Sequence, residues 1–326
     1  MSDGVKKNAM ITGITGQDGS YLAELLLEKN YQVHGLVRPQ TAKHLSEESS
    51  LVRQFLSRIT IHEAEITDRK TLEKILRQVQ PQELYHLAAQ SHVGQSFREE
   101  ALTLEVNINS TYHLLSLFKD LFPDSRFYFA ATSEMFGQAS SESQNELSPF
   151  NPVSPYAVSK LAGFYLTRMF RQAYKLFAVC GILFNHESPR RREDFVSRKI
   201  SLAAAKIKLG LLQELRLGNL DVRRDWGFAG DYVWAMWLML QQERAEDFVI
   251  GTGQSHSLKE LLQIAFGHVG LDWQQHAVID KNLYRPAEIY ELQADPKKAR
   301  EELGWKPEAS FQELIKMMVD ADLARL

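Results

Sequence analysis

The clearest catalytic pattern in this sequence is a tyrosine and a lysine four residues apart, Tyr156 and Lys160. This spacing puts both side chains on one face of a helix, and Ser154 and Pro155 before them suit the cap and first turn of that helix. A nearby ammonium group stabilises a phenolate and brings the pKa of a tyrosine toward working pH. The pair could therefore take a proton from an alcohol, although a solvated surface pair on an amphipathic helix would show the same spacing.

Thr132 and Glu134 add a hydroxyl and a carboxylate directly after an expected buried strand. The carboxyl ends of parallel strands are where open α/β sheets bind ligands. Thr132 with the tyrosine and the lysine fits hydride removal from a secondary alcohol. Simple alcohol oxidation does not need Glu134, whose alternative interpretation is a solvated loop acid.

The extra carboxylate indicates an elimination. Oxidation of a sugar C4 hydroxyl gives a ketone, which acidifies the neighbouring C5–H. A carboxylate can take that proton while the C6 hydroxyl leaves as water, and the stored hydride then returns to C6. The net reaction would be an internal redox dehydration.

A glycine loop precedes this machinery in the chain. Its glycines recur every three residues between an expected strand and an expected helix. A dinucleotide pyrophosphate needs this tight turn, a close approach to the main chain and the positive amino end of a helix. A plain tight turn is the alternative. The candidate cofactor contacts in the loop are Gly13, Thr15, Gly16, Gln17, Asp18 and Gly19.

Arg38 follows the second expected strand, about 20 residues beyond the loop. An acidic residue there would hold the ribose hydroxyls of NAD, whereas an arginine suits the 2′-phosphate of NADP. Arg38 therefore favours NADP over NAD, with an ordinary solvated arginine as the alternative.

Strands and helices alternate through the first half of the chain. The hydrophobic patterns predict strands near residues 8–12, 31–37, 58–62, 83–87, 126–131 and 177–183, with helices near 20–29, 70–79, 104–118 and 156–174. This order predicts an α/β, Rossmann-like fold with a doubly wound parallel sheet. The alternation stops near residue 185. We expect residues 1–184 to form mainly the NADP-binding domain and residues 185–326 a smaller mixed α/β substrate-binding part, with the chain weaving between them.

The composition excludes several functional classes. The 326 residues carry a net charge of −3, so no basic field exists for nucleic acid, and the single cysteine permits no intrachain disulfide. The histidines are not at metal-ligand spacing, and no metal site is expected. The start has no long apolar segment and no apolar run could span a bilayer, so we expect a cytoplasmic protein without a membrane partner.

The chain resembles the GDP-mannose 4,6-dehydratases of the extended short-chain dehydrogenase/reductase group over nearly its whole length. The most specific matches are residues 181–190 (GILFNHESPR) and 224–232 (RDWGFAGDY). The stretches 12–23, 132–137, 218–220 and 285–288 and the Tyr156/Lys160 pair extend the likeness. Where the family usually has two arginines followed by serines, this chain has Arg38-Pro39-Gln40-Thr41.

The resemblance implies an NADP-dependent lyase that converts GDP-mannose to GDP-4-keto-6-deoxymannose for deoxysugar biosynthesis, as a homodimer or homotetramer. Thr132 would hydrogen-bond the C4 oxygen, Tyr156 would take the C4 proton with support from Lys160, and Glu134 would be the C5 base. Further cofactor contacts are implied at Glu65, Ile66, Leu87 and Ala88. Substrate contacts are implied at Ser91, Glu134, Asn185, Val196, Lys199, Gly218, Arg224, Arg285 and Glu288.

Other functions fit parts of the pattern. A sibling dehydratase could act on a GDP-heptose or on a UDP- or dTDP-hexose, but the dTDP-glucose relatives usually carry Asp where this chain has Ser133. A 4-epimerase or 4-keto reductase would not need Glu134. A non-catalytic, cofactor-sensing scaffold would be expected to lose the catalytic residues, which are all present.

Overall fold

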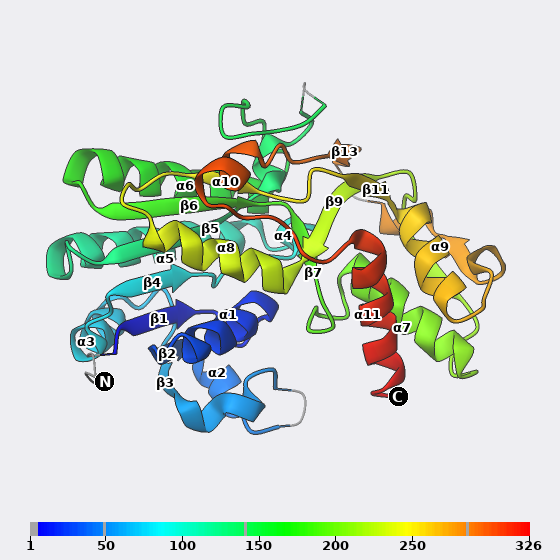
Figure 1. The fold of residues 1–326 in the computed structure, drawn as a ribbon, viewed down its shortest axis with the longest axis horizontal. Helices are drawn as coiled ribbons and strands as arrows, with labels where there is room; N and C mark the ends of the chain where they lie inside the picture. The colour runs from blue at the N-terminus through cyan, green and yellow to red at the C-terminus, as the bar shows by residue number, and fades with distance from the viewer. Residues whose placement is uncertain (1–5, 48–49, 140–141, 285–286) are drawn as a thin grey trace. The chain divides into compact units, whose positions relative to one another are not determined.

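The computed structural model describes residues 6–47, 50–139, 142–284 and 287–326 (Figure 1). The helices are α1 (Gln17–Glu28), α2 (Pro39–Ala42), α3 (Arg69–Val79), α4 (Val93–Ser96), α5 (Glu100–Leu121), α6 (Pro155–Tyr174), α7 (Val196–Lys208), α8 (Ala229–Gln241), α9 (Leu258–His268), α10 (Lys297–Glu302) and α11 (Phe311–Leu323). The strands are β1 (Asn8–Thr12), β2 (Gln32–Val37), β3 (Ile59–Glu63), β4 (Glu83–His86), β5 (Arg126–Thr132), β6 (Phe177–Leu183), β7 (Asn185–Glu187), β8 (Leu215–Leu217), β9 (Arg223–Phe228), β10 (Phe248–Ile250), β11 (Ser255–Ser257), β12 (Ala277–Ile279) and β13 (Glu291–Leu292). Short 3₁₀ turns cover Arg53–Arg58, Ser133–Phe136, Trp273–Gln275 and Lys281–Leu283.

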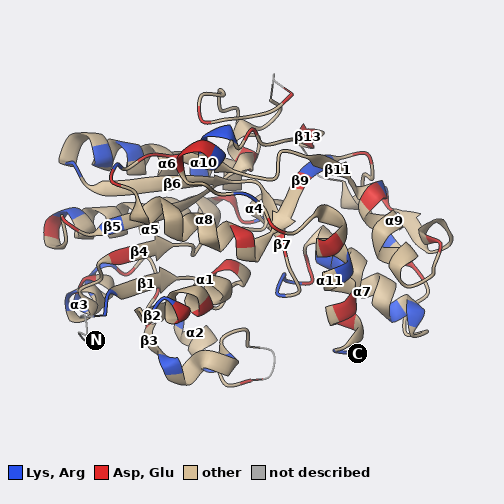
Figure 2. Cartoon of the chain, in the orientation of Figure 1, with Lys and Arg blue, Asp and Glu red and all other residues tan. Residues whose placement is uncertain are grey.

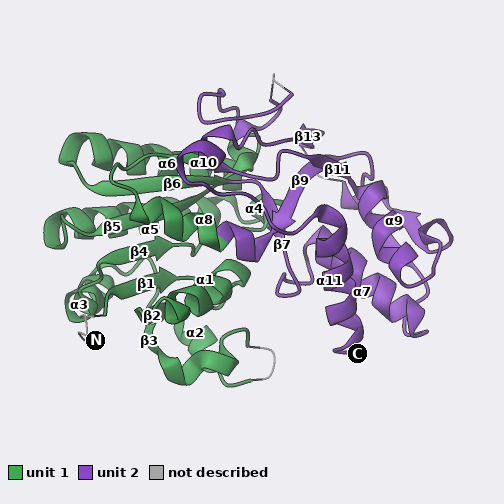
Figure 3. Ribbon diagram, in the orientation of Figure 1, with its two compact units in different colours: residues 1–135, 152–182, 233–248 green, residues 136–151, 183–232, 249–326 purple. Residues whose placement is uncertain are grey.

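The chain forms two compact units (Figure 3). Unit 1 holds residues 1–135, 152–182 and 233–248, and unit 2 holds residues 136–151, 183–232 and 249–326. The expected division at 184/185 lies close to the crossing after residue 182. In two further places the structure divides the chain differently from the expectation, because 136–151 belongs to unit 2 and 233–248 to unit 1.

The sheet of unit 1 has the doubly wound order expected from the sequence. In the described ranges its strands follow the order β10-β6-β5-β4-β1-β2-β3, and the pairs β1–β2, β2–β3, β1–β4 and β4–β5 are parallel. The order reverses between β1 and β4, so this is the switch point at whose carboxyl edge ligands bind. The central strands are buried on both faces, as their continuous apolar runs require.

Unit 2 is built from shorter strands and three packed helices. Around β9 the strands are ordered β11-β9-β13, with β7 also pairing with β9, and β8 pairs separately with β12. Helices α7, α9 and α11 pack against one another over an apolar core. Fully buried members of that core include Ile200, Leu261, Phe266, Leu314 and Met318. This agrees with the expected mixed α/β part.

Basic and acidic side chains are interspersed along the helices of both units (Figure 2). This mixed pattern agrees with the small net charge of −3. In the part of the chain that the structure describes, no helix combines the length and the apolar character needed to cross a membrane.

Gly163 lets α6 lie close to the sheet of unit 1. A Cβ atom built on this glycine would lie 3.0 Å from both Cε1 and Cε2 of Phe129 on β5 and nearer still to its Cζ. Phe129 is 1% exposed and cannot move into solvent. Any side chain at residue 163 would therefore push α6 away from β5.

We predict that Gly163→Ala lowers the free energy of unfolding by about 1–3 kcal/mol, because it overpacks the contact between α6 and β5. Gly267→Ala is the matched control: it also lies in a helix, but its Cβ would meet no described atom within 4 Å. That control should be neutral or stabilising by up to about 1 kcal/mol through helix propensity. Urea unfolding of both variants checks this, and equal losses in the two would contradict the close approach.

Candidate active site

The glycine loop lies between β1 and α1 in the geometry that a pyrophosphate needs. Gly13 has φ +76°, and its carbonyl accepts a hydrogen bond of 3.0 Å from the Gly16 N–H. A Cβ on Gly19 would lie 2.6 Å from the Cα of Ile14, so only glycine lets α1 begin this close to the loop. The N-cap residue of α1 is Gly16, which has no side chain to accept hydrogen bonds from the N–H groups of the first turn. The positive end of this twelve-residue helix therefore faces the loop, which fits a dinucleotide phosphate.

The stretch after β4 is held against this loop by Thr12. Its Oγ1 accepts hydrogen bonds of 3.1 Å from the N–H groups of both Leu87 and Ala88, and it also contacts Nδ1 of His86 at 2.9 Å. Gly13 packs on the same stretch, since its Cβ would lie 2.9 Å from the Ala88 nitrogen. The two predicted cofactor contacts after β4 therefore border the glycine loop. Sequence reasoning missed Thr12 as their support.

Arg38 and the pair Glu65–Ile66 leave neighbouring strands at one edge of the sheet. Arg38 directly follows β2, and Glu65 lies two residues after β3, whose last residue pairs with Val37. Arg38 and Glu65 are exposed, and Ile66 is half-buried. These predicted cofactor contacts thus follow the ends of neighbouring strands, and Arg38 and Glu65 among them are open to solvent.

Lys160 joins α6 to the end of β5. Ser154 caps the helix by accepting a hydrogen bond of 3.1 Å from the Ala157 N–H. One turn after Tyr156, the Lys160 Nζ donates a hydrogen bond of 2.7 Å to the carbonyl of Ala130. Tyr156 is 9% and Lys160 4% exposed. The predicted pair is therefore buried at the carboxyl end of β5, rather than solvated on a helix surface.

Burial lowers the pKa of Lys160 to about 8, while the negative charge of Asp18 acts in the opposite direction. Asp18 lies in the first turn of α1, directly after the glycine loop, so the start of this helix and the lysine influence each other electrostatically. Burial also lowers the pKa of His86 to about 3, with Lys160 contributing, so His86 stays neutral beside the ammonium group. A lysine poised near working pH is typical of catalytic sites.

Thr132 ends β5, and Glu134 sits in the 3₁₀ turn that follows. The N–H of Glu134 donates a hydrogen bond of 3.3 Å to the Thr132 Oγ1, and both side chains are 8% exposed. Lys160 contacts Ala130, two residues before Thr132 on the same strand. The structure thus brings the hydroxyl, the carboxylate and the Tyr156/Lys160 pair to one strand end.

Asn107 on α5 was not foreseen as part of the site. Its Nδ2 donates to the Ser159 Oγ at 2.9 Å and to the Gln90 carbonyl at 3.1 Å, while its Oδ1 accepts from the Gln90 N–H at 2.9 Å. It therefore ties α6 to the loop that carries Ser91, which is exposed. The one sequence feature that could have indicated this role is that Asn107 is a polar residue among the apolar residues of α5.

Arg224 on β9 is buried against the segment that precedes β13 in unit 2. Its Nη1 donates to the carbonyls of Arg223 at 2.8 Å and Ile289 at 2.9 Å, and its Nη2 lies 3.9 Å from an oxygen of Glu288. The structure therefore brings two predicted substrate contacts together. Arg285, another of these predictions, lies outside the described residues.

Lys199 on α7 lies next to the segment that contains Gly218. Its Nζ donates a hydrogen bond of 2.6 Å to the Arg216 carbonyl, and partial burial lowers its pKa, opposed by Asp280. Val196 begins α7, and Asn185 begins β7; both are half-buried. Gly218 is tightly placed, because its Cβ would lie 2.9 Å from the Leu283 carbonyl oxygen. Among the described residues, no group of three or more metal-ligating side chains exists.

Known proteins resemble this chain along almost all of its length. Residues 10–318 match a protein-family model described as GDP-mannose 4,6 dehydratase. The chain is 49% identical to GDP-mannose 4,6 dehydratase 1 of Arabidopsis thaliana, covering 98% of this chain and 90% of that protein. It is 46% identical to the GDP-mannose 4,6 dehydratase of Homo sapiens, covering 97% and 91%. A solved dTDP-glucose 4,6-dehydratase from Streptomyces venezuelae, with NAD and TYD bound, has a TM-score of 0.83 at 26% identity, with 96% of each chain covered.

We predict that the charge of Lys160 destabilises the protein at neutral pH. Its folded pKa of about 8 lies below the ordinary value of 10.5, so the unfolded chain holds the proton more tightly and stability rises as pH increases from about 8 to 10.5. Lys160→Met lacks this gain. From pH 7 to pH 9.5 the stability of the wild type should rise by about 2 kcal/mol relative to the variant.

Urea unfolding of both proteins without cofactor, at the two pH values, measures this difference. Other titrating groups are common to both proteins and cancel. A stability difference that does not change with pH would contradict the lowered pKa.

Proposed function

The chain belongs to the GDP-mannose 4,6-dehydratase family, and from that premise we propose how its own residues carry out the reaction of the family. The enzyme is a hydro-lyase that converts GDP-mannose to GDP-4-keto-6-deoxymannose and water, with NADP as its cofactor. The observation that carries the mechanism is the placement of Glu134 beside Thr132 at the strand end reached by Lys160.

Unit 1 contains the residues that we assign to NADP. The amino end of α1 and the loop at Gly13–Gly16 would hold the pyrophosphate, and Arg38 would pair with the 2′-phosphate. Glu65 and Ile66 would lie at the adenine, and Leu87 and Ala88 would line the chain between the two ends. NADP held by these residues would supply the hydride acceptor for oxidation at C4 and the hydride that is needed later at C6.

The proton steps fall to four side chains. Tyr156 takes the proton of the C4 hydroxyl, and the charge of Lys160 one turn away stabilises the phenolate. The hydroxyl of Thr132 hydrogen-bonds the C4 oxygen. Glu134 then takes the C5 proton, which the C4 ketone has made acidic, and passes it to the C6 hydroxyl, which leaves as water. Both carboxylate and hydroxyl are 8% exposed, so little water competes with the substrate for them.

Unit 2 contains most of the residues that we assign to the GDP group. Arg224 and Lys199 supply positive charge for the diphosphate, and Arg285 is assigned to it by the family pattern. Asn185, Val196, Gly218 and Glu288 would complete the nucleotide contacts, while Ser91 of unit 1 is assigned to the sugar. Relatives that are 46–49% identical to this chain are GDP-mannose 4,6-dehydratases, so another nucleotide sugar, an epimerase or a ketoreductase is not favoured. We also propose a cytoplasmic location.

We predict that Glu134→Gln abolishes water loss from GDP-mannose, because an amide cannot accept the C5 proton. The variant should keep NADP and bind GDP nearly as the wild type does, since the size of the side chain is unchanged. Mass spectrometry of the nucleotide sugar measures the loss of one water, and calorimetry measures GDP binding. Full turnover by the variant would exclude Glu134 as the base, and no product from the wild type would overturn the substrate assignment.

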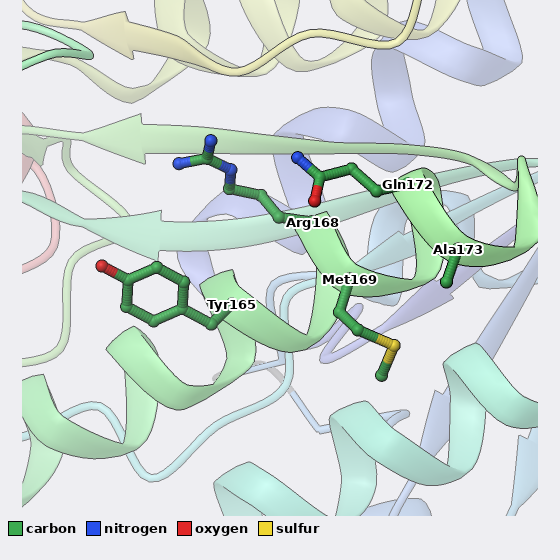
Figure 4. Close-up of a pocket in the computed structure, with 5 residues that line it drawn as sticks. All are labelled: Tyr165, Arg168, Met169, Gln172 and Ala173. Atoms are coloured by element: carbon green, nitrogen blue, oxygen red, sulfur yellow. The ribbon is translucent and has the colours of Figure 1, made fainter.

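We propose that the enzyme is a homodimer that forms through α5 and α6. Tyr165 and Met169 on α6 are 54% and 39% exposed, and Tyr112 on α5 is 46% exposed. Tyr165 and Met169 line a surface hollow of ≈ 600 Å³, together with Arg168, Gln172 and Ala173 (Figure 4). The two helices pack along each other, and the Tyr112 ring on α5 meets the Phe170 ring on α6. A two-fold axis through this face would cover the same apolar side chains on both copies.

We predict that Tyr165→Glu combined with Met169→Glu converts the dimer to single chains, because it places four carboxylates in one buried interface. Leu211→Glu is the matched control, since Leu211 is 63% exposed on unit 2. Light scattering after gel filtration measures the mass. An unchanged mass in the double variant, or single chains in the wild type, would contradict the interface.

A further inference from the structure

The loop from residue 188 to 195 connects β7 to α7 in unit 2. Two of the proposed GDP contacts flank it: Asn185 begins β7, and Lys199 lies in the first turns of α7. A loop of this length places its two ends precisely only if something inside it is fixed. The fixed element is a buried carboxylate that no sequence pattern singled out.

Glu187, the last residue of β7, is 2% exposed. It accepts a hydrogen bond of 2.7 Å from the Ser197 Oγ in the first turn of α7. The same oxygen lies 3.0 Å from the Nε of Arg191, in the middle of the loop. One carboxylate therefore connects the end of the strand, the loop and the start of the helix.

Arg191 is fixed on its other side as well. Its guanidinium group lies 3.6 Å from the centre of the Phe195 ring, at the end of the loop. Its neighbour Arg192 behaves differently, because it is 67% exposed and pairs only with Asp194 within the loop among the described residues. Arg191 is therefore anchored to the protein, whereas the adjacent Arg192 is solvated.

The strand that carries Glu187 is paired in register with β9. Asn185 pairs with Trp226 and Glu187 with Phe228, two and four residues beyond Arg224. The position of β7 is therefore set by β9, and Glu187 passes that position on to α7 through Ser197. Two arginines also support the loop: Arg198 on α7 and Arg325 after α11 both donate to the Pro189 carbonyl, at 2.6 and 2.9 Å.

We propose that Glu187 is a positioning residue for nucleotide binding, which holds Asn185 and Lys199 at a fixed separation by binding Ser197 and Arg191 at once. This inference rests on the proposed function. We assign Glu187 a positioning role rather than a catalytic one, because its described side-chain contacts are to Ser197 and Arg191 of its own unit. Its removal leaves the half-buried Arg191 without its ion pair and the buried Ser197 without its hydrogen-bond acceptor, so the loop relaxes and the GDP contacts separate.

The test uses the NADP-loaded protein and four variants: Glu187→Gln, Ser197→Ala, their combination, and Arg192→Ala as the matched control. Calorimetry gives the Kd for GDP, and initial rates with GDP-mannose give KM and kcat. Glu187→Gln should raise both the Kd and the KM by about ten-fold or more, with kcat within about three-fold and NADP content unchanged. Ser197→Ala should show a smaller change in the same direction, and Arg192→Ala none.

The double variant should bind GDP as tightly as Glu187→Gln alone, with the same Kd and KM, since Ser197 acts through that carboxylate. If Glu187→Gln does not fold, the milder Ser197→Ala variant still decides the question through its Kd and KM. A fall in kcat with unchanged GDP affinity, or losses that add independently in the double variant, would overturn the proposal. If the wild type and Glu187→Gln bind GDP equally well, this inference alone is wrong. If the wild type does not bind GDP, both the proposed function and this inference are wrong.

Discussion

The hydrogen bond from Lys160 to the carbonyl of Ala130 joins the helix that carries Tyr156 to the strand that carries Thr132. Glu134 depends on the same strand end, because its N–H is bound to the Thr132 hydroxyl. A shift of α6 along or away from β5 would therefore separate Tyr156, the proposed acceptor of the C4 hydroxyl proton, from Glu134, the proposed acceptor of the C5 proton. The arrangement of the proposed catalytic residues therefore depends on the contact between α6 and β5.

That contact carries an energetic cost, since it buries an ammonium group and lowers its pKa to about 8. Several features of unit 1 offset the cost. The Ala130 carbonyl accepts a hydrogen bond from the ammonium group, the centre of the Phe129 ring lies 4.8 Å from its nitrogen, and the charge of Asp18 favours the protonated form. The absence of a side chain at Gly163 lets the helix approach closely enough for these contacts. The glycine loop and the first turn of α1 thus contribute both the proposed phosphate cradle and a charge that acts on the proposed catalytic lysine.

Much of unit 1 could be predicted from the sequence, because its signals are local. Apolar runs and glycine spacing predicted β1 to β6, their order of alternation with helices, and the loop before α1. The sequence led us to expect that the chain weaves between the units, but not which segments cross. The crossings depend on contacts between distant residues: Gln144 pairs with Gln293 and Asp295, while Trp237 donates to the Tyr31 hydroxyl. Asn107 and Glu187 were missed for the same reason, since a buried polar side chain is informative only when its partner is known. The roles assigned to the site residues remain predictions.

The two units position their functional residues by different means. In unit 1 long ladders of parallel strands set where each strand ends, and the catalytic groups occupy those ends. Most strands of unit 2 have only two or three residues, so a ladder alone specifies their position weakly. Buried carboxylates provide the missing constraint there. Asp225, which is fully buried, accepts hydrogen bonds from the N–H groups of Thr252, Gly253 and Ala294. Glu187 anchors the loop before α7 through side chains instead, by accepting a hydrogen bond from the Ser197 hydroxyl and pairing with Arg191. Such an anchor fixes a loop at one point and leaves the rest of its sequence free to vary, which suits a unit that recognises a nucleotide rather than one that holds a reaction geometry.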